Sequence, residues 1–251
     1  MVKMIMHGCC GTMGRAITAI VSETEGIEIA AGVDARPQQG MPYPVYASLE
    51  EIREDYDVIV DFSAAAAVDH LLDFCAERKA ALVLCTTGLS EAQVARAKEI
   101  SAVTPVLRSA NMSLGVNLLL KLLKEAAQTL GEAGYDIEIV EKHHNKKVDA
   151  PSGTALALAD AVNEALDEKY HYVTERASRR ARREKTEIGI SSVRGGTLCG
   201  EHDVMFLGTD EVVSFRHEAH SKAVFGRGAV SAALFLAGQK PGLYDMSDVI
   251  G

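Results

Sequence analysis

A short stretch of the chain, EKHHNKKVDAPSGTA at residues 141–155, concentrates protonatable and positively charged side chains. His143 and His144 are adjacent, and a histidine that titrates near neutral pH can supply the proton that completes a reduction. Lys147 can hold a carboxylate through its ammonium group. This composition predicts hydride transfer to a polarised double bond in a small acidic substrate.

The end of the same stretch has the form of a helix start. Pro151 and Gly153 break the chain in front of an apolar helical pattern, and Ser152 or Thr154 can cap that helix. The first N–H groups of a helix favour an anion, so a substrate carboxylate can bind near Gly153. The competing interpretation is a solvated surface loop. A metal site is not expected, because the two histidines are adjacent and no third ligand has a recognisable spacing.

A glycine-rich segment, GCCGTMG at residues 8–14, follows the first predicted strand and opens the first predicted helix. Small residues allow the backbone to approach a pyrophosphate closely, and the helix N-terminus favours its negative charge. Asp34 ends the second predicted strand, where dinucleotide-binding folds place an acid that receives the ribose hydroxyls. We therefore expect a bound dinucleotide, held by Gly8, Cys9, Cys10, Gly11, Thr12, Met13 and Asp34.

Two further segments follow predicted strands, at the sheet edge where open α/β sheets bind ligands. They are Cys85, Thr86 and Thr87, and Ser109, Ala110, Asn111 and Met112. We expect both to face the nicotinamide end of the dinucleotide, and ordinary strand-to-loop turns are the alternative. A nucleophilic thiol of the aldehyde dehydrogenase kind is disfavoured for Cys85, because the run lies inside the predicted nucleotide domain.

Strands and helices must position these residues. In the first part of the chain, short apolar runs alternate with helical patterns, which is typical of a parallel sheet with right-handed crossovers. The predicted strands are residues 2–6, 27–33, 57–62, 81–85 and 104–107, and the predicted helices are residues 13–23, 64–79 and 90–101, with Ser90 as an N-cap and a helical turn at 49–52.

After residue 110 the pattern changes. The predicted elements are a helix at 114–130, a strand at 136–142, a helix at 154–169, alternating strands at 187–193, 201–207 and 211–219, and a helix at 225–237. The short turns between the alternating segments favour antiparallel strands. We expect a dinucleotide-binding domain from residues 1–110 and 224–251, and a substrate-binding domain from residues 111–223.

The bulk composition excludes several classes of protein. The 251 residues, 47% hydrophobic and 24% charged, are typical of a globular protein with a sizeable core. A formal net charge of −9 argues against general nucleic-acid binding. The arginine-rich run at 176–185 is therefore interpreted as a solvated loop within an acidic protein.

The chain also carries no sign of a membrane or secreted protein. The start, MVKMIMHGCCGTMG, leaves too little room for a signal peptide, and no apolar stretch approaches the roughly 20 residues that span a bilayer. The cysteines form no CxxC pair. We expect a reducing, cytoplasmic setting in which they act as small apolar residues.

The sequence resembles the 4-hydroxy-tetrahydrodipicolinate reductase family. Residues 141–155 match the family signature E-x-H-H-x-x-K-x-D-A-P-S-G-T-A at every fixed position. The segments GCCGTMG, CTTG, SANMSLGVN, SVRGGTLCGEHDVMF and GLYDMSDVIG also fit in order. The resemblance therefore covers essentially the whole chain.

The resemblance implies an α/β fold, with a Rossmann-type parallel-sheet domain closed by the C-terminal segment. It implies a further α+β domain for substrate binding, whose open mixed sheet builds a homotetramer. The implied reaction is the reduction of dehydrated 4-hydroxy-tetrahydrodipicolinate, a cyclic dicarboxylate, to tetrahydrodipicolinate in lysine and diaminopimelate biosynthesis. The implied cofactor is NADH or NADPH.

The resemblance also assigns roles to single residues. His143 is the implied proton donor or acceptor, Lys147 a proton donor and substrate ligand, and His144 a substrate ligand, while Gly153 and Thr154 bind a substrate carboxylate. The implied cofactor contacts fall on residues 8–13, 34, 85–87 and 109–112. A non-catalytic dinucleotide sensor on the same fold is the alternative function, but a sensor would not need His143 and Lys147.

The chain departs from the family at two positions that bear on cofactor choice. Family members often carry an arginine before the Met-Gly of the glycine loop and another after the strand-end acid, whereas this chain has Thr12 and Ala35, with Arg15 and Arg36 close by. Asp34 repels a 2′-phosphate unless an arginine compensates its charge. We therefore expect NADH to be preferred, with NADPH use possible.

Overall fold

The computed structural model describes residues 1–109 and 111–251. The chain divides into two compact units. The first unit combines Met1–Leu114 with Ala223–Gly251, and the second unit is the continuous stretch Gly115–Lys222. The first unit is thus formed from both ends of the chain.

The first unit contains a seven-stranded sheet in the order β12-β6-β5-β4-β1-β2-β3. Every neighbouring pair is parallel. The strands are β1 (Val2–His7), β2 (Ile27–Val33), β3 (Val45–Tyr46), β4 (Val58–Asp61), β5 (Ala81–Leu84), β6 (Pro105–Arg108) and β12 (Gly242–Tyr244). The prediction of a parallel sheet with alternating helices is confirmed, although the short strands β3 and β12 were not predicted.

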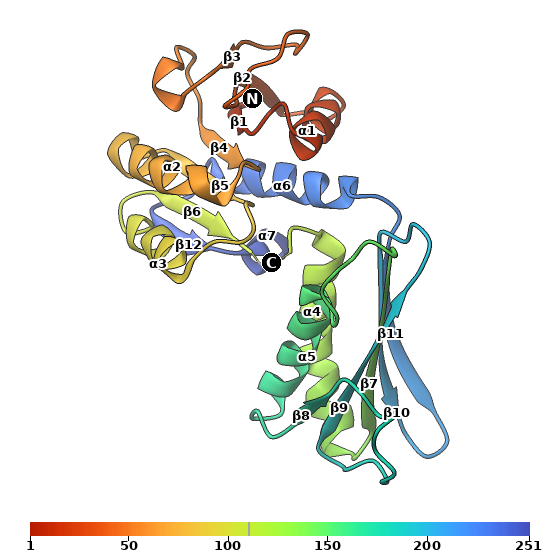
Figure 1. Ribbon diagram of the computed structural model, residues 1–251. Coiled ribbons are helices and arrows are strands. Elements are labelled where there is room, and N and C mark those ends of the chain that lie inside the picture. Colours follow the sequence, from red (N-terminus) through yellow and green to blue (C-terminus); the bar gives the residue numbers. More distant parts are fainter. Residues whose placement is uncertain (110) are drawn as a thin grey trace. The chain divides into compact units, whose positions relative to one another are not determined.

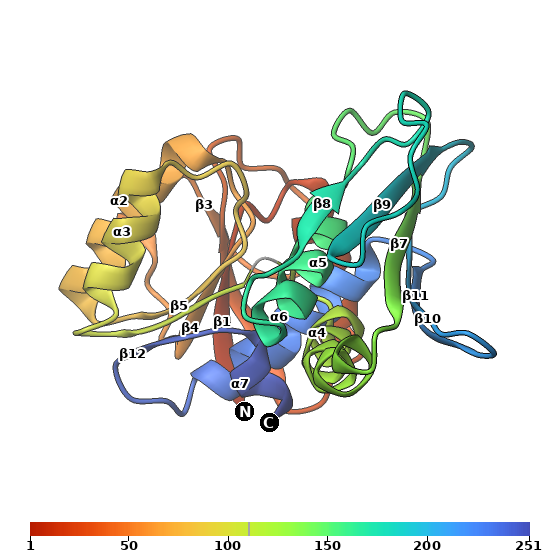
Figure 2. The same cartoon turned by 90° about the horizontal axis from the view of Figure 1, so that it is seen from below.

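Helices cover both faces of this sheet. This is expected, because the central strands carry apolar side chains on both faces. The helices are α1 (Thr12–Ser22), α2 (Ala65–Arg78), α3 (Glu91–Ile100), α6 (Ala223–Leu236) and α7 (Met246–Ile250), with a short 3-10 turn at Leu49–Glu51. Apolar residues of α1 and α6 pack on one face and those of α2 and α3 on the other. Figure 2 shows α6 on one side of the strands, and α2 and α3 on the opposite side. β4 and β5 are therefore buried along their whole length, which explains their unbroken apolar runs.

Helix α3 begins as its sequence predicts. The hydroxyl of Ser90 accepts a hydrogen bond from the backbone N–H of Gln93 at 3.2 Å, and the Gln93 side chain accepts one from the Ser90 N–H at 3.0 Å. This reciprocal arrangement satisfies two N–H groups that a helix start otherwise leaves without partners. The predicted N-cap at Ser90 is confirmed.

The second unit has a mixed five-stranded sheet in the order β11-β10-β7-β9-β8. Its strands are β7 (Asp136–His143), β8 (His171–Val173), β9 (Glu187–Arg194), β10 (Gly200–Leu207) and β11 (Val212–Ala219). β10 is antiparallel to β7 and β11, whereas β9 is parallel to β7 and β8. The expected antiparallel pairing is therefore confirmed for β10 and β11, but it is wrong for β9 and β10. β7 lies between β9 and β10 in the sheet. The alternation of apolar and polar residues predicts that a segment is a strand, but it does not show which other strand will pair with it.

Two helices pack on one face of the mixed sheet: α4 (Leu114–Ala126), which continues into a π-helical turn at Ala127–Gly131, and α5 (Gly153–Ala165) (Figure 1). The core between them contains Ile139, Leu158 and Phe206, all fully buried. Alternate residues of β7, such as Glu138 and Val140, point to the other face and are half-buried. Within the described part of the second unit, no helix covers that other face.

The arginine-rich run at 176–185 is mostly exposed, as interpreted from the sequence, but it is also tied to the sheet. Arg183 donates to the backbone carbonyls of Ile137 and Glu187, both at 2.7 Å, and forms an ion pair with Glu138. Arg176 pairs with the buried carboxylate of Glu187 at 2.6 Å. These arginines stabilise the ends of β7 and β9. In the described chain, none of the helices is long and apolar enough to cross a membrane.

Candidate active site

Two residues of β7, Glu141 and His143, point to the same face of the strand because they are two positions apart. The side chain of Glu141 is fully buried, and His143 is 7% exposed. Nδ1 of His143 lies 2.6 Å from Oε2 of Glu141. Since an ionised carboxylate only accepts hydrogen bonds, Nδ1 carries the proton and Nε2 has the free lone pair when the ring is neutral.

Glu141 is also bound by residues from other segments. Arg194, the last residue of β9, donates from Nη1 to Oε2 and from Nη2 to Oε1, each at 2.7 Å. The backbone N–H of Ser152 donates to Oε1 at 3.1 Å. The sheet register places Arg194 opposite His143. Pairing of β7 and β9 therefore brings together residues that are far apart in the sequence.

Ser152 links this cluster to the start of α5. Its hydroxyl accepts a hydrogen bond from the backbone N–H of Ala155 at 3.1 Å, so the prediction that Ser152 or Thr154 caps the helix is confirmed for Ser152. The same hydroxyl lies 3.0 Å from Nε2 of His202 on β10. The His202 ring meets the His143 ring edge to face, with 5.2 Å between centroids. His143 is thus held by contacts on two sides.

The space beside Nε2 of His143 depends on Gly200, the first residue of β10. A Cβ at Gly200 would lie 3.0 Å from Nε2, closer than side chains normally approach one another. The absence of a side chain at this position leaves room next to the nitrogen that carries the lone pair.

Burial and charge set the protonation of this cluster. Burial raises the pKa of Glu141, but its hydrogen bonds, above all that from Arg194, outweigh burial and hold the pKa at about 2. Burial lowers the pKa of His143 below its usual value and outweighs the opposite influence of Glu141. Burial, reinforced by the charge of His143, lowers the pKa of His202 to about 4. At neutral pH the cluster therefore holds an anionic Glu141 and two neutral imidazoles.

The remaining predicted substrate ligands lie in the loop after β7 and at the start of α5. Lys147 forms an ion pair with Asp149 at 2.9 Å. The backbone N–H of His144 donates to the Leu198 carbonyl at 2.8 Å, and no group among the described residues binds its buried Nδ1. Gly153 and Thr154 are the first residues of α5. Their N–H groups therefore lie at the end of the helix that favours an anion.

The glycine-rich segment of the first unit forms a tight turn between β1 and α1. Gly8 has a φ of +80°. At Gly14, a Cβ would lie 2.4 Å from the Gly8 carbonyl oxygen, so only glycine permits this approach. The N-cap of α1 is Gly11, which has no side chain to bind the first N–H groups of the helix. This arrangement fits the pyrophosphate of a dinucleotide.

Asp34 lies next to this turn, just after β2. The backbone N–H of Cys10 donates to Oδ2 of Asp34, and the N–H of Arg36 donates to Oδ1, both at 3.0 Å. Arg15 donates to the Cys10 carbonyl at 3.2 Å and binds the side chain of Gln38. Cys9 is buried, whereas Thr12 is exposed and Met13 is half-buried. The structure thus places Asp34 beside the predicted pyrophosphate loop.

The segments predicted to face the nicotinamide follow β5 and β6. Thr86 is buried, Thr87 is exposed, and Cys85 is half-buried with a thiol pKa raised by burial. Asn111 accepts a hydrogen bond from the Ser113 N–H at 2.9 Å. Ser109 is half-buried and Met112 is buried, and Ala110 lies outside the described residues.

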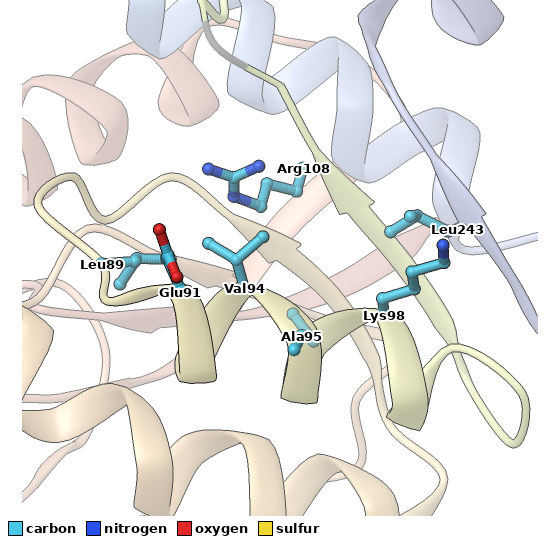
Figure 3. Close-up of a pocket in the computed structure, with 8 residues that line it drawn as sticks. Leu89, Glu91, Val94, Ala95, Lys98, Arg108 and Leu243 are labelled. Carbon is cyan, nitrogen blue, oxygen red and sulfur yellow. The ribbon is translucent and has the colours of Figure 1, made fainter.

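A hollow of about 370 Å³ lies along α3 in the first unit. Figure 3 shows Arg108 extending over Val94, with Lys98 near Leu243. The hollow borders the predicted nicotinamide segments only through Leu89 and Arg108, and none of the predicted site residues lines it.

Two groups in the described chain bring possible metal ligands together: Cys9, Cys10 and Asp34, and His171, Glu184 and Glu187. The first group belongs to the glycine loop, where two backbone N–H groups already bind the Asp34 carboxylate. In the second group, Glu187 is paired with Arg176. Neither arrangement provides an unoccupied set of ligands.

Sequence reasoning did not single out Glu141, Arg194, Gly200 or His202 as site residues. Glu141 is a fixed position of the 141–155 signature, and the other three lie in the segment SVRGGTLCGEHDVMF. That segment marked the family resemblance, but its spacing alone gives no role. Only the pairing of β9 and β10 with β7 places these residues around His143.

Models of a known family match nearly the whole chain. The model "Dihydrodipicolinate reductase, N-terminus" matches residues 2–112, and "Dihydrodipicolinate reductase, C-terminus" matches residues 115–250. A 4-hydroxy-tetrahydrodipicolinate reductase from Caldanaerobacter subterraneus subsp. tengcongensis is 50% identical, over 100% of this chain and 98% of the relative. One from Clostridium botulinum is 45% identical, over 100% and 99%.

The fold is also similar to that of a solved structure. Dipicolinate-bound dihydrodipicolinate reductase from Paenisporosarcina sp. TG-14 superposes with a TM-score of 0.81 at 24% identity, covering 98% of this chain and 97% of the other. At this identity the likeness supports the fold. It agrees with a Rossmann-like parallel sheet joined to a mixed-sheet unit.

Proposed function

The chain belongs to the dihydrodipicolinate reductase family, and we propose that the buried cluster around His143 is the acid–base part of its active site. The chain is an oxidoreductase that reduces 4-hydroxy-tetrahydrodipicolinate in lysine biosynthesis. Enzymes of this family use NAD(P)H. The observation that carries the proposal is the Nδ1 contact of His143 with a buried, ionised Glu141.

The glycine turn and Asp34 would hold the cofactor, which supplies a hydride when it is bound. The turn suits a pyrophosphate because Gly14 has no side chain and the N-terminus of α1 has no side-chain cap. Asp34 has its carboxylate oriented by two backbone N–H groups, and it would accept the ribose hydroxyls. The segments at 85–87 and 109–112 would line the nicotinamide end.

The start of α5 and the loop before it would bind the dicarboxylate. The N–H groups of Gly153 and Thr154 would receive one carboxylate at the positive end of the helix. Lys147 would bind substrate through its ammonium group, which the carboxylate of Asp149 holds at 2.9 Å. His144, with a buried Nδ1 that no described residue binds, would be a further substrate ligand.

Nε2 of His143 would donate the proton that the reduction consumes. Because Nδ1 is bound to Glu141, Nε2 is the atom that takes up and releases a proton. Burial keeps the pKa of His143 below its usual value, so the protonated ring is a stronger acid than free histidine. Lys147 would be a second proton donor.

The arrangement around Asp34 supports a preference for NADH. A 2′-phosphate would have to approach the carboxylate of Asp34, and Thr12 and Ala35 stand where family members often have arginines. Arg15, the arginine of α1, is engaged with the Cys10 carbonyl and Gln38. NADH has no phosphate at this position and avoids the repulsion.

A coupled assay tests both the reaction and the preference. Aspartate semialdehyde, pyruvate and a condensing synthase would generate the substrate, and absorbance would follow consumption of NADH or NADPH in separate runs. We expect oxidation of both, with a higher kcat/KM for NADH. No oxidation would contradict the proposed site, and a tenfold or larger advantage of NADPH would contradict the preference.

The second unit supports a homotetramer as the assembled form. Within the described residues, one face of its sheet carries no helix, and that face includes Val140 and Met205, both half-buried in the single chain. A second copy covering this face would bury their apolar surface. Light scattering after size-exclusion chromatography would test the assembly, and the mass of a single chain would contradict it.

A further inference from the structure

We propose that Glu141 is a positioning residue with two tasks: it fixes which nitrogen of His143 carries the exchangeable proton, and it holds the substrate-binding start of α5. We further propose that Arg194 keeps Glu141 in place for both tasks. The inference rests on the proposed function, in which His143 transfers a proton and α5 receives a carboxylate. It assigns a role to residues that the sequence alone did not single out.

Several hydrogen-bond donors bind the one carboxylate of Glu141. Oε1 accepts from Nη2 of Arg194 at 2.7 Å and from the Ser152 N–H at 3.1 Å. Oε2 accepts from Nη1 of Arg194 at 2.7 Å and from Nδ1 of His143 at 2.6 Å. Each oxygen therefore binds one guanidinium nitrogen and one further donor. The carboxylate is fully buried, so these protein groups replace the water that it loses.

The hydrogen bond to Glu141 also fixes the tautomer of His143. Glu141 accepts the Nδ1 proton, and a neutral ring then has its lone pair on Nε2. Nε2 is the atom beside the space that Gly200 leaves without a side chain. If the proton moved to Nε2, the lone pair would face a carboxylate and the pair would repel. Glu141 therefore selects the tautomer whose basic atom is Nε2, the ring nitrogen next to Gly200.

The Glu141–Arg194 pair also holds the loop before α5. Glu141 binds the Ser152 N–H, and Ser152 in turn caps the helix through the Ala155 N–H. Nη2 of Arg194 also donates to the carbonyl of Asp149 at 2.7 Å, and Asp149 pairs with Lys147. The Glu141–Arg194 pair thus binds both ends of the short stretch Asp149–Ser152, which connects Lys147 to the start of α5.

The charges around His143 agree with a positioning role. Glu141 on β7 favours the protonated ring, whereas Arg194 on β9, Lys147 on the following loop and burial disfavour it, and His202 on β10 also faces the ring. An unpaired Glu141 would hold a proton on His143 firmly. Burial first, and then the charges of Lys147 and Arg194, offset the influence of Glu141 on the pKa of His143, so the ring can both release and take up a proton.

The test compares two glutamine variants on the same strand. Glu141→Gln keeps the shape of the side chain, but it replaces one carboxylate oxygen with an amide N–H₂ group, which cannot accept the Nδ1 proton of His143. We expect kcat to fall roughly 100-fold, as when an acid–base group loses its orientation, and the KM for substrate to rise. Glu138→Gln is the matched control, because Glu138 lies on the opposite face of β7 and pairs with Arg176 and Arg183. It should leave kcat and KM unchanged.

A spectroscopic readout separates positioning from a loss of folding. ¹⁵N NMR of histidine-labelled wild-type protein at neutral pH should show His143 protonated on Nδ1, and Glu141→Gln should shift the ring toward the Nε2–H tautomer. Arg194→Lys keeps the positive charge but loses the paired guanidinium nitrogens that bind both oxygens of Glu141. It should lower kcat less than Glu141→Gln does. Wild-type His143 found as the Nε2–H tautomer would overturn the proposal even if the variants did not fold.

The outcomes also distinguish this inference from the proposed function. If His143→Gln is inactive while Glu141→Gln behaves like Glu138→Gln, then only the role of Glu141 is refuted. If His143→Gln retains wild-type activity, then the proposed acid–base site itself is wrong. A fall in kcat for Glu141→Gln together with the tautomer shift would support both.

Discussion

The two units each contain a buried histidine–carboxylate pair, but the two carboxylates have different partners. In the first unit, Nδ1 of His7 lies 2.8 Å from Oδ1 of Asp61, and in the second, Nδ1 of His143 lies 2.6 Å from Oε2 of Glu141. The histidines are 8% and 7% exposed, and both carboxylates are fully buried. Geometry at the shared hydrogen bond therefore does not distinguish the pairs.

The remaining contacts distinguish them. His7 and Asp61 are register partners on the neighbouring strands β1 and β4, and Oδ1 of Asp61 also accepts the nearby N–H of Ser63. Glu141 instead binds a guanidinium from β9 and a backbone N–H in front of α5. The His7–Asp61 pair thus joins two strands. A pair of this kind becomes suited to proton transfer when further groups fix the carboxylate and space remains beside the other ring nitrogen.

The largest expected difference between the pairs is in the rate of reaction. His143→Gln removes the proposed proton-transfer group, so kcat should fall roughly 100-fold or more, with little change in the dissociation constant of NADH. His7→Gln alters the pair in the first unit and should lower kcat less than about threefold, because no proton of the reaction passes through it. Steady-state kinetics and NADH titration of both variants would measure this. Equal losses of kcat would remove the distinction between the pairs.

A smaller effect is expected from closing the space beside His143. Gly200→Ala would place a methyl group 3.0 Å from Nε2 and should displace the ring, which lowers kcat/KM by roughly tenfold. Gly195→Ala is the control, because a Cβ there would meet no atom within 4 Å. Steady-state kinetics would measure kcat/KM for the two variants, at a temperature where thermal unfolding shows that both are folded. The space has no role if Gly200→Ala retains full activity.

The smallest expected difference concerns stability in acid. The pKa of Glu141 is lowered from 4.5 to about 2 in the folded chain. For Asp61, burial raises the pKa, but the hydrogen bond and charge of His7 outweigh burial and leave it below 3.8. A depressed pKa stabilises the fold above the unfolded value, and that stability is lost as pH falls toward the folded pKa.

The Glu141 contribution should therefore be present at pH 6 and fade between pH 4.5 and about 2. The cost of Glu141→Gln to the free energy of unfolding should be larger at pH 6 than at pH 3. The cost of Asp61→Asn should also be smaller at pH 3 than at pH 6, because the pKa of Asp61 is lowered by His7 as well. Urea unfolding at the two pH values would measure both costs. A cost of Glu141→Gln that does not vary with pH would contradict the assigned pKa.

Much of the fold could be predicted because most of its strands and helices carry a clear apolar pattern. The apolar runs of β1, β4 and β5 and the cap at Ser90 are visible in the sequence and are present in the structure. The strands β3, β8 and β12 were missed because they have only two or three residues, too few to show alternation. The neighbour of β9 was also missed, since pairing is decided by the whole sheet and not by one strand.

The candidate site divides in a similar way. Residues that share one stretch, such as His143, Lys147 and Gly153, could be proposed from spacing and from the family signature. Arg194 and His202 could not, because their link to His143 passes through strand pairing and not through sequence distance. The role of Glu141 was hidden for a related reason. A carboxylate in a strand has no apparent function until its hydrogen-bond donors are known.

The first unit is built from both ends of the chain, and this affects the order in which the two units can fold during synthesis. Helix α6 supplies Val230 and Leu236 to the core beneath the parallel sheet, and it is synthesised after the whole second unit. At a synthesis rate of ~5–20 residues per second, the N-terminal strands wait on the order of ten seconds for this helix. The second unit is continuous and can complete its own core first. The region that carries His143 can therefore be folded before the region that carries Asp34, although it leaves the ribosome later.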